Sequence, residues 1–201
     1  MRFMLGSLSD YDVSDETVSN EMPELERWVL HRLCELDEKV QQRYDSYDFQ
    51  GVFQAIFTFA TVDLSSFYFD IRKDVLYCDG DTIERRSART VLNLLFHRLT
   101  TWLAPILVFT MEEVWLERYP DKDSSVHLVD IPNTPSEWRD DKLAKKWSIV
   151  RSYRRLVTSA LELQRVDKVI GSSLEAAPTV HVQDKDALSV LESVPLSLIH
   201  I

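Results

Sequence analysis

The residues best suited to chemistry are arginines in the last third of the chain: Arg151, Arg154, Arg155 and Arg165. On a helix with 100° per residue, they fall within an arc of roughly 100°. Guanidinium groups bind phosphate oxygens in a bidentate manner, so this pattern predicts a phosphate-binding helix face. The alternative is a solvated face whose arginines pair with acids from the first third of the chain.

The residues between these arginines predict a helix that packs along one flank. The segment Asp140 to Val166 carries an apolar stripe at helical spacing, formed by Leu143, Trp147, Val150, Val157 and Leu161. The predicted helix Thr82–Leu103 has an apolar stripe of its own, formed by Ala88, Leu92, Leu95, Leu99 and Trp102. A second basic cluster, Arg85, Arg86 and Arg89, flanks this stripe. Phosphate contact and a structural role are both open for this second cluster.

Catalytic motifs are absent from the sequence, which contains no phosphate-binding loop and no serine nucleophile elbow. Glu112 and Glu113 are adjacent, and adjacent helical residues diverge by about 100°, so they do not form an acid–base pair. The five histidines are scattered along the chain. We therefore expect no catalytic residue, no metal ligand and no cofactor in this chain.

The two cysteines, Cys34 and Cys78, stand apart without the spacing of metal ligands. We expect both to be small core residues of a protein from a reducing cytoplasm.

Charge is unevenly distributed along the 201 residues. The net charge of −10 disfavours simple nucleic-acid binding, since phosphate contacts need a basic surface. Residues 1–48 hold 12 acids and 5 bases (−7), whereas residues 139–168 hold 9 bases and 4 acids (+5). A binding face needs only the basic segment.

The elements predicted to position these residues are mainly helices, since there are only four glycines. The apolar spacing predicts helices over Arg2–Leu8, Pro23 to about Tyr44, Phe49–Phe69, Thr82–Leu103 and Asp140–Val166. The helix Phe49–Phe69 is apolar nearly all round, which predicts a place in the middle of a bundle. Asp70–Asp81 is expected to be a polar connection, and Asp121–Glu137 a linker. No run of about 18 apolar residues is found, so we expect no membrane span.

A helical corner is predicted where Thr82–Leu103 meets Ala104-Pro105, because proline ends or kinks a helix. Thr110 and Glu113 have the spacing of a capping box for the short helix that follows, which runs to about Arg118.

The last segment predicts a change of structure. Gly171 can end the long helix in a left-handed conformation. Thr179–Val182 alternates like a strand, Asp184–Glu192 is a predicted short helix, and Leu196–Ile201 is a second predicted strand. The expected fold is thus mainly α, an antiparallel helical bundle over residues 1–170 followed by a partial α/β segment over residues 171–201. Because the chain opens inside an apolar element, we expect it to be a piece of a longer protein.

Several stretches resemble a known family. The string APILVFTMEEVW at Ala104–Trp115 resembles a signature in the anticodon-binding bundle of class I aminoacyl-tRNA synthetases of the Ile/Val/Leu/Met group. Four further strings resemble segments of the isoleucyl branch, in the expected order along the chain: RFMLGSL, SSFYFDIRKDVLY, RRSARTVL and RVDKVIGSSLEA.

The resemblance implies a module that holds the anticodon stem and loop of isoleucine tRNA in a monomeric, cytoplasmic enzyme. It implies phosphate contacts from Arg151, Arg154, Arg155, Arg165 and Lys168, with Arg2 near the anticodon side. The HIGH and KMSKS motifs are missing, so this stretch would not be catalytic by itself. ATP, Mg²⁺ and, in some members, Zn²⁺ would serve other parts of the enzyme. The alternatives are the same domain of a valyl or leucyl enzyme, and a non-enzymatic helical scaffold whose acidic first third binds a basic partner.

Overall fold

The computed structural model describes residues 1–172 and 175–195. It divides into two compact units, Met1–Asp140 and Asp141–Ile201. This division falls before the long helix that carries the arginines, whereas residues 1–170 were expected to form one bundle. Within the second unit, the long helix contacts the short helix that follows it. Whether residues 1–170 act as one functional domain stays a prediction.

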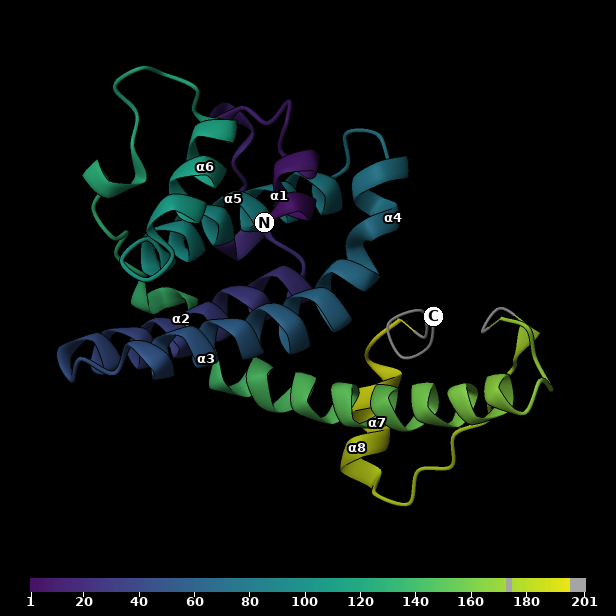
Figure 1. Ribbon diagram of the computed structural model, residues 1–201. Coiled ribbons are helices and arrows are strands. Elements are labelled where there is room, and N and C mark those ends of the chain that lie inside the picture. The colour runs from purple at the N-terminus through teal and green to yellow at the C-terminus, as the bar shows by residue number, and fades with distance from the viewer. Residues whose placement is uncertain (173–174, 196–201) are drawn as a thin grey trace. The chain divides into compact units, whose positions relative to one another are not determined.

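The first unit is built from helices that pack around α5. Its elements are α1 (Arg2–Ser7), α2 (Glu24–Asp45), α3 (Phe49–Thr58), a π-helical segment (Phe59–Phe69), α4 (Asp70–Cys78), α5 (Ile83–Leu103) and α6 (Val108–Arg118). Figure 1 shows α2 and α3 side by side, joined by a tight turn, and α5 contacts α1, α2, α4 and α6. The predicted antiparallel arrangement of helices is confirmed.

The core of the first unit contains the apolar stripe that the sequence predicted on α5. All five stripe residues are buried: Ala88, Leu92, Leu95, Leu99 and Trp102. Trp28 of α2 is also buried and meets the ring of Phe67 edge-on at 5.3 Å. Helical spacing of large apolar side chains was therefore sufficient to identify the centre of this unit.

The helix that begins with α3 at Phe49 is longer than the sequence predicted. It continues through the π-helical segment into α4 and ends at Cys78, so the expected polar connection at Asp70–Asp81 is wrong over its first nine residues. The polar residues of α4 have partners there: the Lys73 Nζ lies 2.9 Å from Asp70 Oδ1, and Arg72 binds Glu26 of α2. Polarity indicated a loop because these ion pairs were not visible in the sequence.

The expectation that this helix lies in the middle of the bundle is also wrong. Only one of its sides packs against the bundle, through residues such as Val52, Ile56 and Leu64, whereas Phe53 and Phe57 remain on the surface. By length and composition alone the continuous helix Phe49–Cys78 is apolar enough to cross a membrane, but packed core helices also meet this criterion, so the expectation of no membrane span stays a prediction. The helix also buries Asp63, whose carboxylate lies 3.0 Å from Arg32 of α2, as in a helix packed in a bundle.

The proline corner between α5 and α6 forms, but the capping box does not. Helix α6 begins at Val108, two residues before Thr110, and no side chain caps it. Glu112, and not Glu113, has the carboxylate that makes hydrogen bonds at this corner: it accepts from the Ser125 hydroxyl and the Val126 N–H, each at 3.0 Å. Glu112 thus ties α6 to the loop after it.

The second unit contains α7 (Asp141–Val166) and α8 (Lys185–Glu192). The left-handed residue after α7 is Lys168, with φ 57°, and not Gly171. The N–H of Val169 bonds to the carbonyl of Gln164, which closes the last turn of the helix. The expected strand Thr179–Val182 is wrong, because the described residues include no strand to pair with it. The expected strand Leu196–Ile201 lies outside the described residues.

The two cysteines are free thiols in different surroundings. Cys34 is buried and its Sγ lies 3.5 Å from the Pro135 carbonyl, whereas Cys78 is exposed at the end of α4, so its expected place in the core is wrong. Burial, with a smaller contribution from the charge of Asp37, raises the pKa of the Cys34 thiol to about 11.

We therefore expect a thiol reagent at pH 8 to modify Cys78 quickly and Cys34 only as the protein opens. A time course with Ellman's reagent, repeated in denaturant, should show one fast thiol in the folded protein and two in the unfolded protein. Two equally fast thiols in the folded protein would contradict the burial of Cys34.

Candidate nucleic-acid interface

The arginines of α7 differ sharply in their access to solvent. Arg155 and Arg165 are exposed and Arg151 is half-buried, whereas Arg154 is only 5% exposed. Arg154 lies on the same side of α7 as the buried residues Val150 and Val157, and it has an interaction partner. The arc predicted from spacing therefore overlaps the packed side of the helix, and Arg154 is not available to a phosphate in this structure.

The exposed cations lie at both ends of α7, near its middle and just after it. Arg165 pairs with Glu162 one turn earlier, at 3.0 Å, and both side chains are about half exposed. Such an exposed pair contributes little to stability, so a phosphate could replace the carboxylate at small cost. Lys168 is exposed in its left-handed turn, and Lys142 and Lys145 are exposed at the start of the helix. Arg151, Arg155, Arg165 and Lys168 stay predicted contacts.

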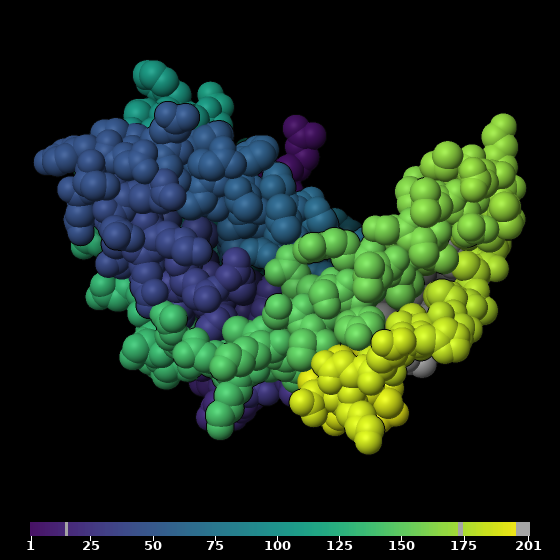
Figure 2. Space-filling view, turned by 90° about the horizontal axis from the view of Figure 1, so that it is seen from below, coloured from purple at the N-terminus to yellow at the C-terminus, as the bar shows by residue number. Residues whose placement is uncertain are grey.

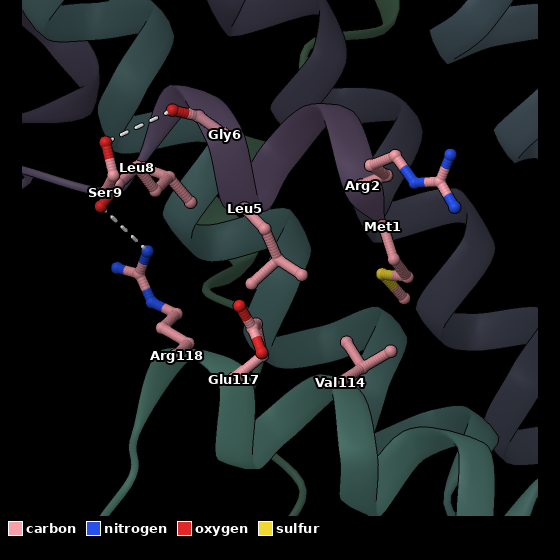
Figure 3. Close-up of a pocket in the computed structure, with 9 residues that line it drawn as sticks. All are labelled: Met1, Arg2, Leu5, Gly6, Leu8, Ser9, Val114, Glu117 and Arg118. Carbon is pink, nitrogen blue, oxygen red and sulfur yellow. Dashed lines mark hydrogen bonds between the residues drawn. The ribbon is translucent and has the colours of Figure 1, made fainter.

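Arg2 belongs to the first unit, on α1. It borders a cavity of about 770 Å³ between α1 and α6, which is also lined by Leu5, Val114 and Glu117. In Figure 3 the Arg2 guanidinium projects away from Val114 and Glu117. Arg2 is exposed, and among the described residues no carboxylate lies within ion-pair distance of it. It is therefore a free cation, on a different unit from the cations of α7.

A second arginine beside this cavity, Arg118 of α6, serves the fold. Its Nη2 donates to Asn93 Oδ1 at 2.7 Å and its Nη1 to the Leu8 carbonyl at 3.4 Å, the latter drawn in Figure 3. Its guanidinium also lies over the rings of Phe96 and Tyr119 at 5.4 and 5.3 Å. These contacts hold α1, α5 and α6 together, so Arg118 is a structural residue.

The second basic cluster is also largely structural. Arg89 is buried, bonds to Asp10 at 2.6 Å and lies 5.4 Å from the ring centre of Tyr11. Arg86 pairs with Asp81 at 3.1 Å, and Arg85 Nε donates to a main-chain carbonyl at 3.4 Å. Of the two readings left open for this cluster, the structure favours packing over phosphate contact.

Comparison with known proteins now bears on these cations. The family model described as "Anticodon-binding domain of tRNA ligase" matches residues 26–180, which is most of the chain. The chain belongs to this family. The matched residues include most of α2 and all of α3 to α7, and thus the predicted contacts on α7, while Arg2 precedes them.

Curated relatives of this anticodon-binding domain carry the name isoleucine–tRNA ligase. The protein of Ruegeria pomeroyi is 66% identical over 197 residues, which are 98% of this chain and 20% of the relative. That of Brucella abortus is 54% identical over 193 residues, 96% of this chain and 20% of the relative. That of Bartonella henselae is 46% identical over 198 residues, 98% of this chain and 20% of the relative. The chain thus spans about a fifth of the length of these relatives.

Two histidines of this anticodon-binding domain, His31 and His97, have structural partners. His31 is fully buried, and its Nδ1 accepts the N–H of Asp140 at 2.9 Å. His97 Nε2 lies 2.8 Å from the Tyr119 hydroxyl, whose oxygen already accepts from Arg118 Nε at 2.8 Å. The hydroxyl hydrogen is then available to a neutral His97. His200 lies outside the described residues.

The pKa of His97 couples this cluster to pH. Burial, followed by the positive charges of Arg118 and Arg98, lowers the pKa of His97 from its ordinary 6.5 to about 4. Below pH 6.5, His97 is therefore protonated in the unfolded chain, whereas in the folded protein it stays neutral until about pH 4. This contribution to stability is complete above pH 6.5 and is lost as the pH falls towards 4.

We expect urea unfolding at pH 7 and pH 4.5 to show this loss, and the variant His97→Gln to show a smaller one. Glutamine can still accept from Tyr119 but does not titrate. Carboxylates contribute equally to both proteins, so the difference between them isolates His97. Equal pH dependence in the two proteins would contradict the assignment.

One surface feature was missed by sequence reasoning, namely the exposed aromatic side chains Phe53 and Phe57 of α3. They were expected in the interior because the helix is apolar nearly all round. The polar residues Gln50, Gln54 and Thr58 interleave with them and are the only sequence signal that this side faces solvent.

Proposed function

We propose that this chain binds the anticodon stem and loop of a tRNA, and that the tRNA is isoleucine tRNA. The family match over residues 26–180 is the observation that carries the proposal. The names of the relatives support the choice of isoleucine over valine or leucine. The exposed cations Arg155, Arg165 and Lys168 on α7, with Arg2 on α1, supply groups for the phosphates.

These cations position the tRNA backbone and carry no sequence information by themselves. In this proposal the chain is the tRNA-holding part of an isoleucine–tRNA ligase, an enzyme that joins isoleucine to its tRNA with ATP. It acts in the cytoplasm as a monomer, performs no catalysis by itself and holds no cofactor or metal. ATP, Mg²⁺ and any Zn²⁺ then bind elsewhere in a longer protein.

The second candidate is a helical scaffold that binds a basic partner through its acidic first third. Residues 1–48 carry a charge of −7, which favours such a partner. Several of these acids are already paired within the first unit, however, including Glu26 with Arg72 and Asp10 with Arg89. The acidic segment is thus partly neutralised, which weakens this alternative.

A titration of the 201-residue chain with three RNAs tests the proposal: isoleucine tRNA, the same tRNA with a swapped anticodon, and valine tRNA. Each is measured at low and at moderate salt. We expect the tightest binding to native isoleucine tRNA, with affinity falling as salt rises because phosphate contacts release counterions. Equal affinity for all three would restrict the chain to a general tRNA-binding role. Absence of binding at low salt, together with binding to a basic peptide, would favour the scaffold.

A further inference from the structure

The exposed rings of α3 border a groove in the first unit. Phe53 and Phe57 are 39% and 52% exposed, one helical turn apart. Their rings stack with centres 5.9 Å apart and planes 21° from parallel. Figure 2 shows the α3 segment, in blue, at the surface of this unit. Two adjoining phenylalanine rings that face solvent are a feature typical of a binding surface.

The groove itself lies between α1 and the continuous helix Phe49–Cys78, with a volume of about 380 Å³. Its base is formed by buried apolar side chains such as Leu64 and Leu99, and its far wall includes Phe3, which stacks on Phe69 at 4.5 Å. This volume is at the small end of ligand pockets, which span ~300–1,000 Å³. It suits a single ring system better than a helix or a strand.

Two polar side chains stand at this apolar groove. Arg2 is exposed and has no ion-pair partner among the described residues, and the exposed Ser65 hydroxyl is likewise without a hydrogen-bond partner in that part of the chain. Among the residues that the structure describes, no acidic side chain lines the groove. Aromatic faces, a free guanidinium and a free hydroxyl together match a ligand that is flat, apolar on its faces and negatively charged at one end.

The backbone of the groove is itself unusual. Four lining residues, Ala60, Leu64, Ser65 and Phe69, belong to the π-helical segment, where the Ser66 hydroxyl bonds to the Thr61 carbonyl at 2.6 Å. Segments of π-helix are uncommon and often occur at functional sites. The widened turn changes which side chains of the helix Phe49–Cys78 face α1, and so contributes to the shape of the groove.

We propose that this groove binds one unpaired base of the tRNA loop. The base stacks on the rings of Phe53 and Phe57, Arg2 contacts the adjoining phosphate, and the Ser65 hydroxyl bonds to the base edge. This inference rests on the proposed function, and it identifies a surface for loop bases that is separate from the cations of α7. Its occupant is a nucleotide because a base offers a flat face to the stacked rings and its phosphate offers a negative charge to Arg2.

The test uses two RNAs with the whole 201-residue chain. One is the anticodon stem–loop of isoleucine tRNA with 2-aminopurine in the loop, and the other is a blunt duplex of the same stem. We expect Phe57→Leu to weaken binding of the stem–loop about tenfold, as one stacked base is lost, and to leave duplex binding unchanged. The fluorescence change of 2-aminopurine on binding should also disappear.

Two further variants separate stacking from charge and from general loss of aromatic surface. Arg2→Gln should weaken stem–loop binding and reduce its salt slope by about 1, whereas Phe57→Leu should leave the slope unchanged. Phe109→Leu removes a ring that is more exposed and does not line the groove, so it should bind like the parent chain. Circular dichroism checks that each variant is folded, which is expected because these side chains are exposed.

Each other outcome overturns the inference. Unchanged stem–loop binding by folded Phe57→Leu would show that the groove does not take a base, while leaving tRNA binding intact, and would favour a protein partner for this surface. Failure of the parent chain to bind the stem–loop at low salt would overturn both this inference and the proposed function.

Discussion

Replacement of Glu26 by alanine is expected to lower the free energy of unfolding of the first unit by about 3–5 kcal/mol, the cost of breaking a buried ion pair on one side. Glu26 is 0% exposed, and both of its oxygens bind the Arg72 guanidinium at 2.7 Å. The buried hydroxyl of Tyr68 also donates to Glu26, at 3.1 Å. Alanine would leave a mostly buried guanidinium and a buried hydroxyl without their acceptor.

The physical reason for this large effect is the position of the pair. It joins α2 to the continuous helix Phe49–Cys78 at the junction of the π-helical segment and α4, where both partners are almost fully buried. Burial, and then the charge of Glu26, raises the pKa of the Tyr68 hydroxyl well above its usual value, so Tyr68 stays a neutral donor. The pair therefore holds α4 in the helix that the sequence alone predicted to end at Phe69.

Thermal unfolding followed by circular dichroism provides the measurement, with an expected fall in Tm on the order of 10 °C. Glu38→Ala is the matched control, since Glu38 pairs with Arg139 at the surface and such pairs contribute ~0–1 kcal/mol. Equal melting temperatures for Glu26→Ala and Glu38→Ala would contradict the structural role assigned to the buried pair.

Removal of the three exposed cations in the second half of α7 and just after it should have the largest effect on RNA binding. The combined variant Arg155→Ala, Arg165→Ala and Lys168→Ala is expected to weaken tRNA binding on the order of 100-fold at low salt, at ~1 kcal/mol per contact. The slope of log affinity against log salt should decrease by about 2 to 3, because three phosphate contacts are lost.

Two exposed lysines of the first unit, Lys39 and Lys122, allow a control for net charge. Their double replacement by alanine changes the total charge in the same direction without touching α7. If this control weakened binding as much per charge as the α7 variant, the interaction would depend on net charge and not on the particular cations Arg155, Arg165 and Lys168. We expect a loss several times smaller per charge.

The parts of the fold that followed from the sequence are those decided by the spacing of apolar residues. The stripe on α5, from Ala88 to Trp102, is buried as expected, and α2 and α7 have nearly the predicted ends. The parts that did not follow depend on partners distant in sequence. Glu26 is 46 residues from Arg72, and only their contact explains why α4 continues the helix.

The candidate site shows the same division. Spacing placed Arg154 and Arg155 on one side of α7, but a single helix gives no means of telling which of two adjacent arginines faces solvent. Likewise, an all-round apolar helix gave no indication that Phe53 and Phe57 face outward, because that depends on how many neighbours surround α3. The backbone geometry at the end of α7 was the least predictable feature, since Lys168 adopts the left-handed conformation expected of Gly171.

The most direct test of the central claim is hydroxyl-radical footprinting of isoleucine tRNA with the 201-residue chain at low salt. The proposed function predicts protection confined to the anticodon stem and loop, with stem protection reduced by the α7 variant. Protection of the acceptor end, or uniform weak protection along the whole tRNA, would contradict it.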